Sequence, residues 1–228
     1  MELIIIIIAI IAIIIILFMM KTNVNDLKKL ALDKELNTIS EKFPDNIEIG
    51  KAILEKLKNK TTKIEEDKES EATLYIAIQD KISIGNTHKS FTRIQTITHE
   101  CLHSIQDKKM LIFNFIYSNI YLLYFAIICI LVILKKLDNT MMYSNIFLIL
   151  SFIYYVIRVF LENDAMIKAQ YIAKEYMQEQ EVVTEEEVNK IYEGFQNLNK
   201  GLIKDTNSRL FTGIMIKLVI FNVLALIF

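Results

Sequence analysis

The stretch THECLHSIQD, residues 98–107, holds the side chains of this sequence whose types and spacing could do chemistry. His99 and His103 lie four residues apart, so on a helix their imidazoles face the same way. Two imidazoles on one helix face can bind one metal ion, and the H-E-x-x-H pattern is typical of zinc peptidases. The alternative is a pair of surface histidines on an ordinary helix. In a chain with three histidines, such a pair seldom falls into the H-E-x-x-H pattern by chance.

Glu100 follows the first histidine and is not expected to bind the metal. In a zinc peptidase the carboxylate at this position holds the zinc-activated water, takes its proton as general base and returns it to the leaving amine. The pattern therefore predicts a Zn²⁺ cofactor and makes Glu100 the candidate catalytic residue for hydrolysis of a peptide bond.

A third metal ligand is expected, because a catalytic zinc usually has three protein ligands and one open position. Glu162 is the predicted ligand, since the chain leaves an apolar segment at this residue and returns to the side that carries the motif. Asp164 is the nearest alternative, either as a ligand or as a partner that orients a histidine. A solvated carboxylate at the start of a helical segment is the ordinary alternative for both.

The donor that stabilises the oxyanion of the reaction is left open by the sequence. His88, Tyr75 and Tyr171 are the candidates. The two cysteines, Cys101 and Cys129, have no nearby cysteine partner, so neither a disulfide framework nor a cysteine-based zinc site is expected.

The elements that position these residues include long apolar segments, because hydrophobic residues make up 53% of the chain although 23% of residues are charged. Four segments are long enough to cross roughly 30 Å of hydrocarbon as helices. They are residues 3–20, 110–134, 141–161 and 210–228. The first is expected to be an uncleaved anchor rather than a signal peptide, since no basic residue precedes it and no A-x-A-like site follows. Lys217 falls within the last and either reaches toward the membrane surface or faces the protein interior.

The order of these segments predicts a topology. The short link KKLDNT makes 110–134 and 141–161 an antiparallel hairpin, so the polar segments 21–109 and 162–209 lie on one face of the membrane. Most flanking lysines lie on that face, with Lys135 and Lys136 on the other, so the positive-inside rule places both polar segments in the cytoplasm. The prediction is a multi-pass protein of the cell membrane with both termini outside.

The polar segments predict mostly helices. Residues 24–43 and 46–60 are typical of two amphipathic helices, and 62–72 of a solvated linker. Residues 73–84 predict a short β-hairpin that turns at Gln79-Asp80, and Ser90 is the expected N-cap of the helix that carries the motif.

Four stretches together resemble a known family, the bacterial membrane-bound neutral zinc metallopeptidases of the YugP type. The matching residues are HECLHSIQ (99–106) and ENDA (162–165), and the stretches IGKAILEKL (49–57) and EVVTEEEVNKIYEGF (181–195) also resemble family segments. In order and spacing the likeness covers most of the chain. The chain is more remotely similar to membrane gluzincins of the CAAX-prenyl-protease type.

The resemblance implies that His99, His103 and Glu162 bind zinc and that Glu100 is the general base. It implies a mainly α, integral membrane fold, in which four transmembrane helices accompany a zincin-like (gluzincin) catalytic helical part and a short β-hairpin. Residues 1–228 are expected to form a single metallopeptidase domain. The chain departs from the family at Leu102 and Ser104, where Gly and Ala are usual, and these departures bear on helix packing and substrate preference.

The predicted function is that of a membrane-integral zinc endopeptidase whose substrates are peptides or membrane-associated proteins and whose surroundings are the lipid bilayer. The net charge of -1 gives no bias toward nucleic acid, so none is expected as a partner. The alternative is a non-catalytic membrane scaffold or partner-binding protein with a degenerate peptidase fold. The sequence does not indicate an oligomeric state.

Overall fold

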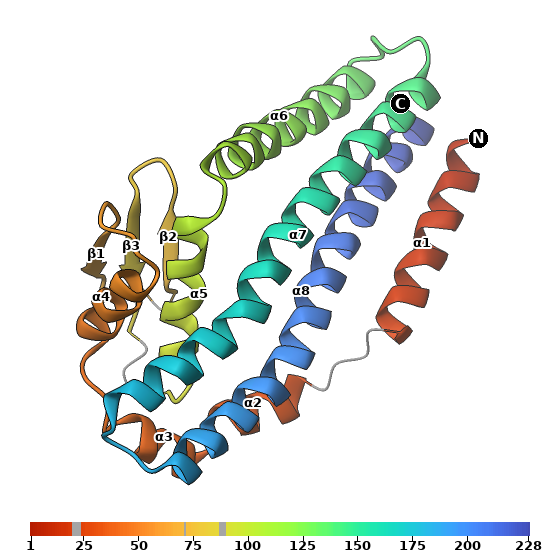
Figure 1. The fold of residues 1–228 in the computed structure, drawn as a ribbon. Helices are drawn as coiled ribbons and strands as arrows, with labels where there is room; N and C mark the ends of the chain where they lie inside the picture. Colours follow the sequence, from red (N-terminus) through yellow and green to blue (C-terminus); the bar gives the residue numbers. More distant parts are fainter. Residues whose placement is uncertain (20–23, 71, 87–89) are drawn as a thin grey trace. The chain divides into compact units, whose positions relative to one another are not determined.

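The computed structural model describes residues 1–19, 24–70, 72–86 and 90–228 (Figure 1). Of residues 24–26 it describes the backbone only. In this part of the chain the fold is mainly helical, as predicted, and it contains a small three-stranded sheet where a two-stranded β-hairpin was predicted. The chain divides into two compact units. One contains Met1–Thr22, Phe113–Phe160 and Lys204–Phe228, and the other contains Asn23–Ile112 and Leu161–Ile203. The single-domain prediction stays a prediction.

Among the described residues, four helices are long and apolar enough to cross a membrane. They are α1 (Glu2–Met19), α6 (Lys108–Ile133), α7 (Thr140–Gln180) and α8 (Glu185–Ile227). Each predicted apolar segment coincides with one of these helices or with a part of it. Three of the predictions extend one residue too far: Leu134 and Phe228 follow their helices, and residue 20 lies outside the described residues. The last two segments are not separate helices, because α7 and α8 continue without a break into the polar parts of the sequence. No proline interrupts either helix, and residues such as Ala165 and Ala169 favour helix continuation.

The first unit is held by aromatic packing and by hydrogen bonds between its helices, two of which mark one end of the unit. Thr140 Oγ1 donates to Glu2 Oε1 at 2.7 Å, and Asn222 Nδ2 donates to Ser144 Oγ at 3.0 Å. The beginning of α1, the beginning of α7 and the C-terminal end of α8 therefore lie at one end of this unit. This arrangement agrees with the antiparallel order predicted for the apolar segments.

Side chains at the centre of the first unit are aromatic. The rings of Tyr121 and Phe147 stack with their centroids 5.3 Å apart, and both residues are almost completely buried. Lys217 is half-buried, and its ammonium lies 5.8 Å from the centroid of the Tyr121 ring. Many apolar side chains of the unit face outward, including Phe18 of α1, which is 81% exposed. A helix that is apolar around its whole circumference is typical of a membrane span.

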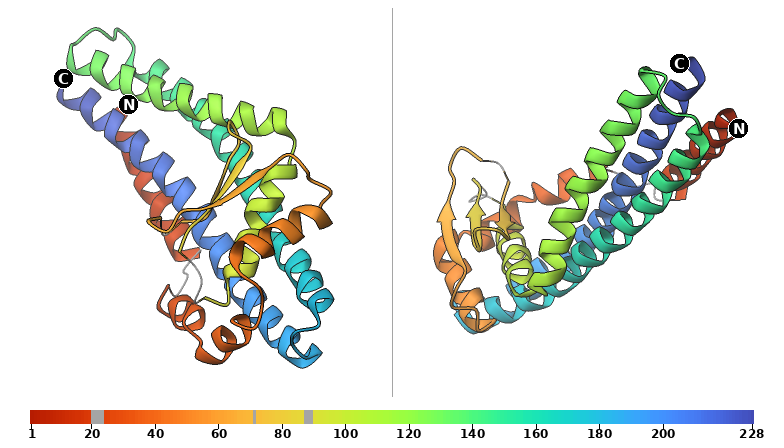
Figure 2. Two further views of the ribbon diagram at one scale, coloured as in Figure 1. Left: turned by 90° about the vertical axis from the view of Figure 1, so that its left-hand side faces the viewer. Right: turned by 90° about the horizontal axis from the view of Figure 1, so that it is seen from above.

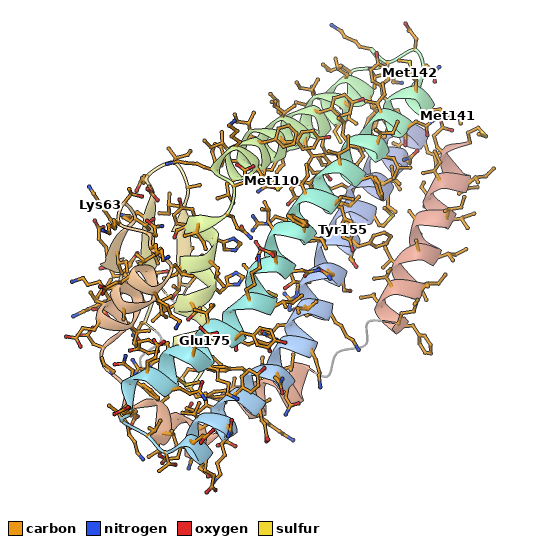
Figure 3. All side chains as sticks on the ribbon, in the orientation of Figure 1. Lys63, Met110, Met141, Met142, Tyr155 and Glu175 are labelled. Carbon is orange, nitrogen blue, oxygen red and sulfur yellow. The ribbon has the colours of Figure 1, made fainter. Side chains whose placement is uncertain are left out.

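The second unit begins with three short helices, α2 (Val24–Ala31), α3 (Lys34–Ser40) and α4 (Asn46–Lys56). The prediction of one helix over 24–43 is wrong, because α2 ends at Ala31 and Asp33 caps a separate helix, α3, by accepting a hydrogen bond from Leu36 N at 3.0 Å. Asp45 caps α4 in the same way, with 2.9 Å to Glu48 N. Lys56 of α4 pairs with Glu175 of α7 at 3.2 Å, and Glu175 is labelled in Figure 3.

The sheet of the second unit has the strand order β1-β3-β2, formed by β1 (Lys63–Glu66), β2 (Leu74–Ile76) and β3 (Lys81–Ile84). β2 and β3 pair antiparallel across the predicted turn, where Asp80 has a φ of 47°. β1 pairs parallel with β3 and replaces part of the linker predicted over 62–72. The sequence signal for β1 is weak, because Ile64 is its only apolar residue.

The motif helix is α5 (Arg93–Ile105), which packs on α4 and lies against β2 and β3 (Figure 2). The predicted N-cap, Ser90, is wrong by two residues: Thr92 precedes the helix, and Ser90 Oγ lies 2.7 Å from Thr92 Oγ1. The apolar stripe of α5 is fully buried at Ile94, Ile97 and Cys101, whereas Ile105 is 45% exposed. Cys101 and Cys129 are free thiols.

The first turn of α5 is anchored by Arg93, whose side chain is 3% exposed. Its guanidinium donates to the carbonyl oxygens of Ser40, Phe43 and Pro44 at 2.7, 2.9 and 2.8 Å. Burial lowers the pKa of Arg93 and outweighs the nearby Tyr176, Asp45 and Glu41, which raise it. The carbonyls satisfy this buried cation and fix the start of α5 to the loop that follows α3.

Candidate metal centre

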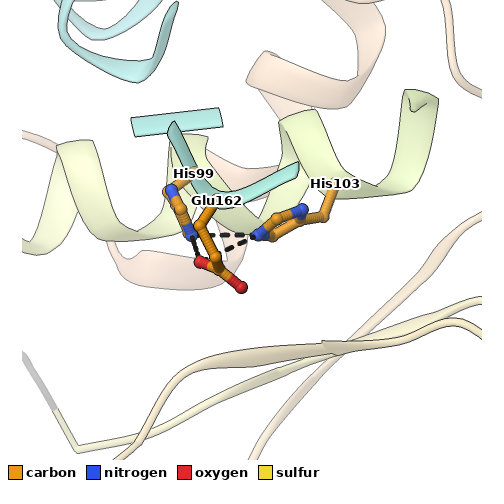
Figure 4. Close-up of side chains that lie close together, drawn as sticks. All are labelled: His99, His103 and Glu162. Atoms are coloured by element: carbon orange, nitrogen blue, oxygen red, sulfur yellow. Dashed lines mark hydrogen bonds and ion pairs between the residues drawn. The ribbon is translucent and has the colours of Figure 1, made fainter. Parts of the chain in front are cut away.

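Helices α5 and α7 bring together the three residues predicted as metal ligands (Figure 4). His99 and His103 project from α5, and Glu162 projects from α7. One ligand atom of each lies within 4.8 Å of the others. The two Nε2 atoms are 3.0 Å apart, and Glu162 Oε2 lies 3.5 Å from Nε2 of His99 and 3.7 Å from that of His103.

These distances fit a tetrahedral zinc site. With metal–ligand distances of about 2.0–2.1 Å, the ligand atoms of a tetrahedral zinc lie about 3.3 Å from one another. The three observed distances lie on both sides of this value. Two imidazoles and one carboxylate are also a donor set that suits Zn²⁺, whereas Mg²⁺ and Ca²⁺ prefer oxygen ligands only. The residues therefore fit a zinc ion with a fourth position left for another ligand.

The electrostatics of the three residues favour positive charge between them. Their side chains are only 15%, 11% and 12% exposed, so solvent screens the site weakly. Burial lowers the pKa of His103, but the neighbouring Glu162 and Glu100 carboxylates raise it more, so that it lies above its usual value. Since two lone pairs at 3.0 Å repel, a proton or a metal cation between the Nε2 atoms relieves the repulsion.

Glu100 lies beside the three residues but points one oxygen elsewhere. Its Oε1 is 3.9 Å from His99 Nε2, and its Oε2 accepts a hydrogen bond from the backbone N–H of Tyr75 at 2.6 Å. Burial raises the pKa of Glu100, although His99, His103 and the Tyr75 N–H act in the opposite direction. A buried carboxylate with a raised pKa, one oxygen anchored and the other near the metal ligands has the properties of a general base.

The role of Tyr75 differs from the one considered from the sequence. Its backbone N–H, on β2, contacts the site, while its hydroxyl donates to Asp80 Oδ1 at 3.0 Å. Burial and Asp80 raise the pKa of the hydroxyl to about 12. Tyr171 is 51% exposed and packs against Tyr192, with ring centroids 6.1 Å apart. His88, the remaining candidate oxyanion donor, lies outside the described residues.

Gln106 is a site residue whose contacts the sequence did not predict. Its Oε1 lies 2.8 Å from His103 Nδ1, and its Nε2 donates to Leu161 O at 2.9 Å and to Asp164 Oδ2 at 3.3 Å. Asp164 contacts Gln106 and pairs with Lys168 at 2.6 Å. Burial raises the pKa of Asp164, but Lys168 and Gln106 lower it more, so the net direction is downward. The sequence signals for Gln106 were its position about one turn after His103 and its place at the end of the stretch HECLHSIQ.

A buried amide pair holds α5, α7 and α8 together beside the site. Gln95 Nε2 donates to Asn199 Oδ1, and Asn199 Nδ2 donates to Met166 O at 2.9 Å. Gln95 lies one turn before His99, and Met166 lies one turn after Glu162. The pair therefore fixes the distance between the two helices that carry the candidate ligands.

Leu102 and Ser104 are both accommodated by their neighbours. Leu102 is 4% exposed and packs against Ala165 and Ala169 of α7. Ser104 Oγ donates to Cys101 O at 2.6 Å and accepts from Asn59 Nδ2 at 2.8 Å. The small alanines leave room for Leu102, so α5 and α7 pack closely next to the candidate ligands.

Comparisons with protein-family models, with curated proteins and with solved structures find no match for this chain. The geometry of His99, His103 and Glu162, with Glu100 beside them, is therefore the basis for a functional proposal.

Proposed function

We propose that this protein is a membrane-integral, zinc-dependent metallopeptidase. The observation that carries the proposal is the meeting of His99, His103 and Glu162 within 4.8 Å, with a Glu100 oxygen 3.9 Å from His99 Nε2. The resemblance of HECLHSIQ and ENDA to the YugP-type metallopeptidases supports the same function.

In the proposed reaction His99, His103 and Glu162 hold the metal, which when bound polarises the peptide carbonyl and acidifies a water molecule. Glu100 accepts a proton from the attacking water through the oxygen that faces the metal ligands, and then passes it to the leaving amine. The Tyr75 N–H keeps the other oxygen in place, so that the carboxylate need not reorient between the two transfers. Its raised pKa favours the first of these transfers, because it makes the carboxylate a stronger base.

The proposed substrates are peptides or membrane-associated proteins close to the bilayer surface. Leu161, which accepts the Gln106 hydrogen bond, is the last residue of one predicted span, and Met110 is the first residue of another. Within the second unit, Gln106 therefore contacts the last residue of one predicted span and precedes the first residue of another by four residues. His103 lies three residues before Gln106. The lysine distribution supports placing this site on the cytoplasmic side of a bacterial cell membrane.

The test compares the wild-type chain and Glu100→Gln, both purified in detergent, against a library of fluorescence-quenched peptides with zinc supplied. We expect the wild type to cleave peptides, and Glu100→Gln to be slower by about 10²-fold or more with its zinc content unchanged. Equal cleavage by the variant would rule out the assigned base. A zinc-loaded wild type that cleaves no peptide, in the library or in its own membranes, would favour the non-catalytic scaffold instead.

A further inference from the structure

We infer that Gln106 is a positioning residue that fixes the ring of His103 for the metal, and that Asp164 acts on His103 through Gln106. The inference rests on the proposed metal centre and concerns how it is held. Its basis is an unbroken set of hydrogen bonds from α7 to the second histidine of α5.

The orientation of the Gln106 amide is determined by its partners. A glutamine side chain has one acceptor oxygen and one NH₂ group with two donor hydrogens. Two acceptors, Leu161 O at 2.9 Å and Asp164 Oδ2 at 3.3 Å, lie around Nε2. The reversed amide would place its oxygen against these two oxygens, so Oε1 must face His103.

This orientation sets the tautomer of His103. Because Oε1 can only accept, the Nδ1 of His103, 2.8 Å away, carries the hydrogen of the neutral ring. The lone pair is then on Nε2, the atom that lies 3.0 Å from His99 Nε2 and 3.7 Å from Glu162 Oε2. The nitrogen that faces the other candidate ligands is therefore the one able to bind a metal.

Gln106 also links the two ligand-bearing helices. It is the residue at which the chain leaves α5, with extended backbone at φ -62° and ψ 160°, and from there its side chain reaches α7. Its two acceptors on α7, Leu161 and Asp164, stand on either side of Glu162 in the sequence. The Gln106 side chain thus sets both the tautomer of His103 and the orientation of its ring relative to Glu162.

The test measures the zinc dissociation constant of the full-length protein in detergent, by competition with a chromophoric chelator. Gln106→Met keeps the size of the side chain and removes its hydrogen bonds. We expect it to weaken zinc binding by about 10- to 100-fold and to shift the visible absorption bands of the Co²⁺-loaded protein. Gln178→Ala, which removes an exposed amide of α7 about four turns after Glu162, is the matched control and should leave both unchanged.

A double-variant comparison tests whether Asp164 acts through Gln106. Asp164→Ala should weaken zinc binding in the wild-type background and have no further effect in Gln106→Met, because the link to His103 is already absent. Equal effects of Asp164→Ala in both backgrounds would overturn the indirect role of Asp164. Wild-type zinc affinity in Gln106→Met would overturn the role of Gln106 and leave the metal centre standing. No zinc binding by the wild type would overturn the metal centre and this inference with it.

If Gln106→Met does not fold, as judged by its circular dichroism spectrum, Gln106→Ala and Asp164→Ala supply the same comparison. Asp164→Ala removes one of the two acceptors that orient the amide and leaves Gln106 itself in place. Weakened zinc binding with an unchanged melting temperature would support a role for Gln106 in positioning His103. If zinc affinity and melting temperature fell together, Gln106 would only stabilise the fold, and the inference would be overturned.

Discussion

The carboxylate of Glu100 meets different surroundings at its two oxygens. Oε2 is held by the Tyr75 N–H at 2.6 Å, whereas Oε1 faces His99 Nε2 at 3.9 Å. The strand β2 thereby takes part in the site through its backbone, and anything that displaces β2 displaces the proposed base. The residue that holds β2 at its turn is Asp80.

Asp80 provides a prediction about pH. Its Oδ1 accepts from Thr62 Oγ1 at 2.7 Å and from Tyr75 OH at 3.0 Å, and its Oδ2 accepts from Thr61 Oγ1 at 2.9 Å. Burial raises the pKa of Asp80, but these hydroxyl donors lower it more, so the folded value lies below the usual one. A carboxyl group whose pKa is lower in the folded than in the unfolded chain stabilises the fold at any pH above its pKa in the unfolded chain, about 3.9 for Asp. This stabilisation is lost as the pH falls through the pKa of the group in the folded chain.

We therefore expect Asp80→Asn to melt at a lower temperature than the wild type at pH 7, with the difference shrinking below about pH 4. Asparagine suits this comparison because it tolerates the φ of 47° at this position. Thermal melts in detergent between pH 3 and 7 provide the measurement. A difference of the same size at pH 3 and pH 7 would contradict the role assigned to the Asp80 charge.

At the residue scale, the sequence pattern was informative for contacts made within one helix and poor for contacts between helices. His99, Glu100 and His103 are recognisable because four residues make about one turn. Glu162 could be predicted because the hairpin returns the chain to the motif. Gln106 could not, since its acceptor Leu161 lies 55 residues away and only the fold brings the two together.

At the scale of elements, α8 acts on the site without supplying a candidate ligand. Asn199 joins Gln95 of α5 to the Met166 carbonyl of α7, and all three lie in the second unit. Removing this side chain leaves the buried Gln95 amide donor without its acceptor, and it leaves the Met166 carbonyl with its helical hydrogen bond alone. Each such loss costs about 1–3 kcal/mol.

Asn199→Ala is therefore expected to lower stability by about 2 kcal/mol or more and to weaken zinc binding, because α5 and α7 are no longer held at a fixed distance. Asn197→Ala, on the exposed face of the same helix, is the control and should leave both quantities unchanged. Chemical denaturation and chelator competition on the two variants measure them. If Asn199→Ala behaved like the control, the buried amide pair would not position the helices.

The elements themselves were predicted unevenly, for physical reasons. The apolar runs identified all four long helices, since a span needs uninterrupted hydrophobic residues. Their continuation into polar sequence was missed, because hydropathy changes at Glu162 although the helix does not end there. β1 was missed because Ile64 alone marks it as a strand, and its pairing with β3 depends on residues Lys81–Ile84 further along the chain.

At the scale of the whole molecule, the hydrogen bonds of the first unit bear on topology. Thr140 with Glu2, and Asn222 with Ser144, place the N-terminus, the α6–α7 connection and the C-terminal end of α8 at the same end of that unit. Together with the four apolar helices, this supports an even number of crossings with both termini on one side.

Cysteine labelling in intact cells tests this topology. We expect Asp138→Cys, in the α6–α7 connection, to react with a membrane-impermeant maleimide from outside the cell. Lys51→Cys, exposed on α4, should react only after the membrane is permeabilised. The unmodified chain provides the baseline, since Cys101 is buried and Cys129 half-buried. The reverse pattern would place the metal centre on the outer face.

The central claim is that His99, His103 and Glu162 form a metal centre, and the most direct measurement is zinc content by mass spectrometry of detergent-purified protein. We expect one zinc ion per chain in the wild type, none in His99→Ala and a reduced content in Glu162→Gln. Glu175→Gln, on α7 away from the three residues, should keep the wild-type content. A correctly folded wild type without zinc after supply of the metal, or equal zinc content in all four proteins, would contradict the account.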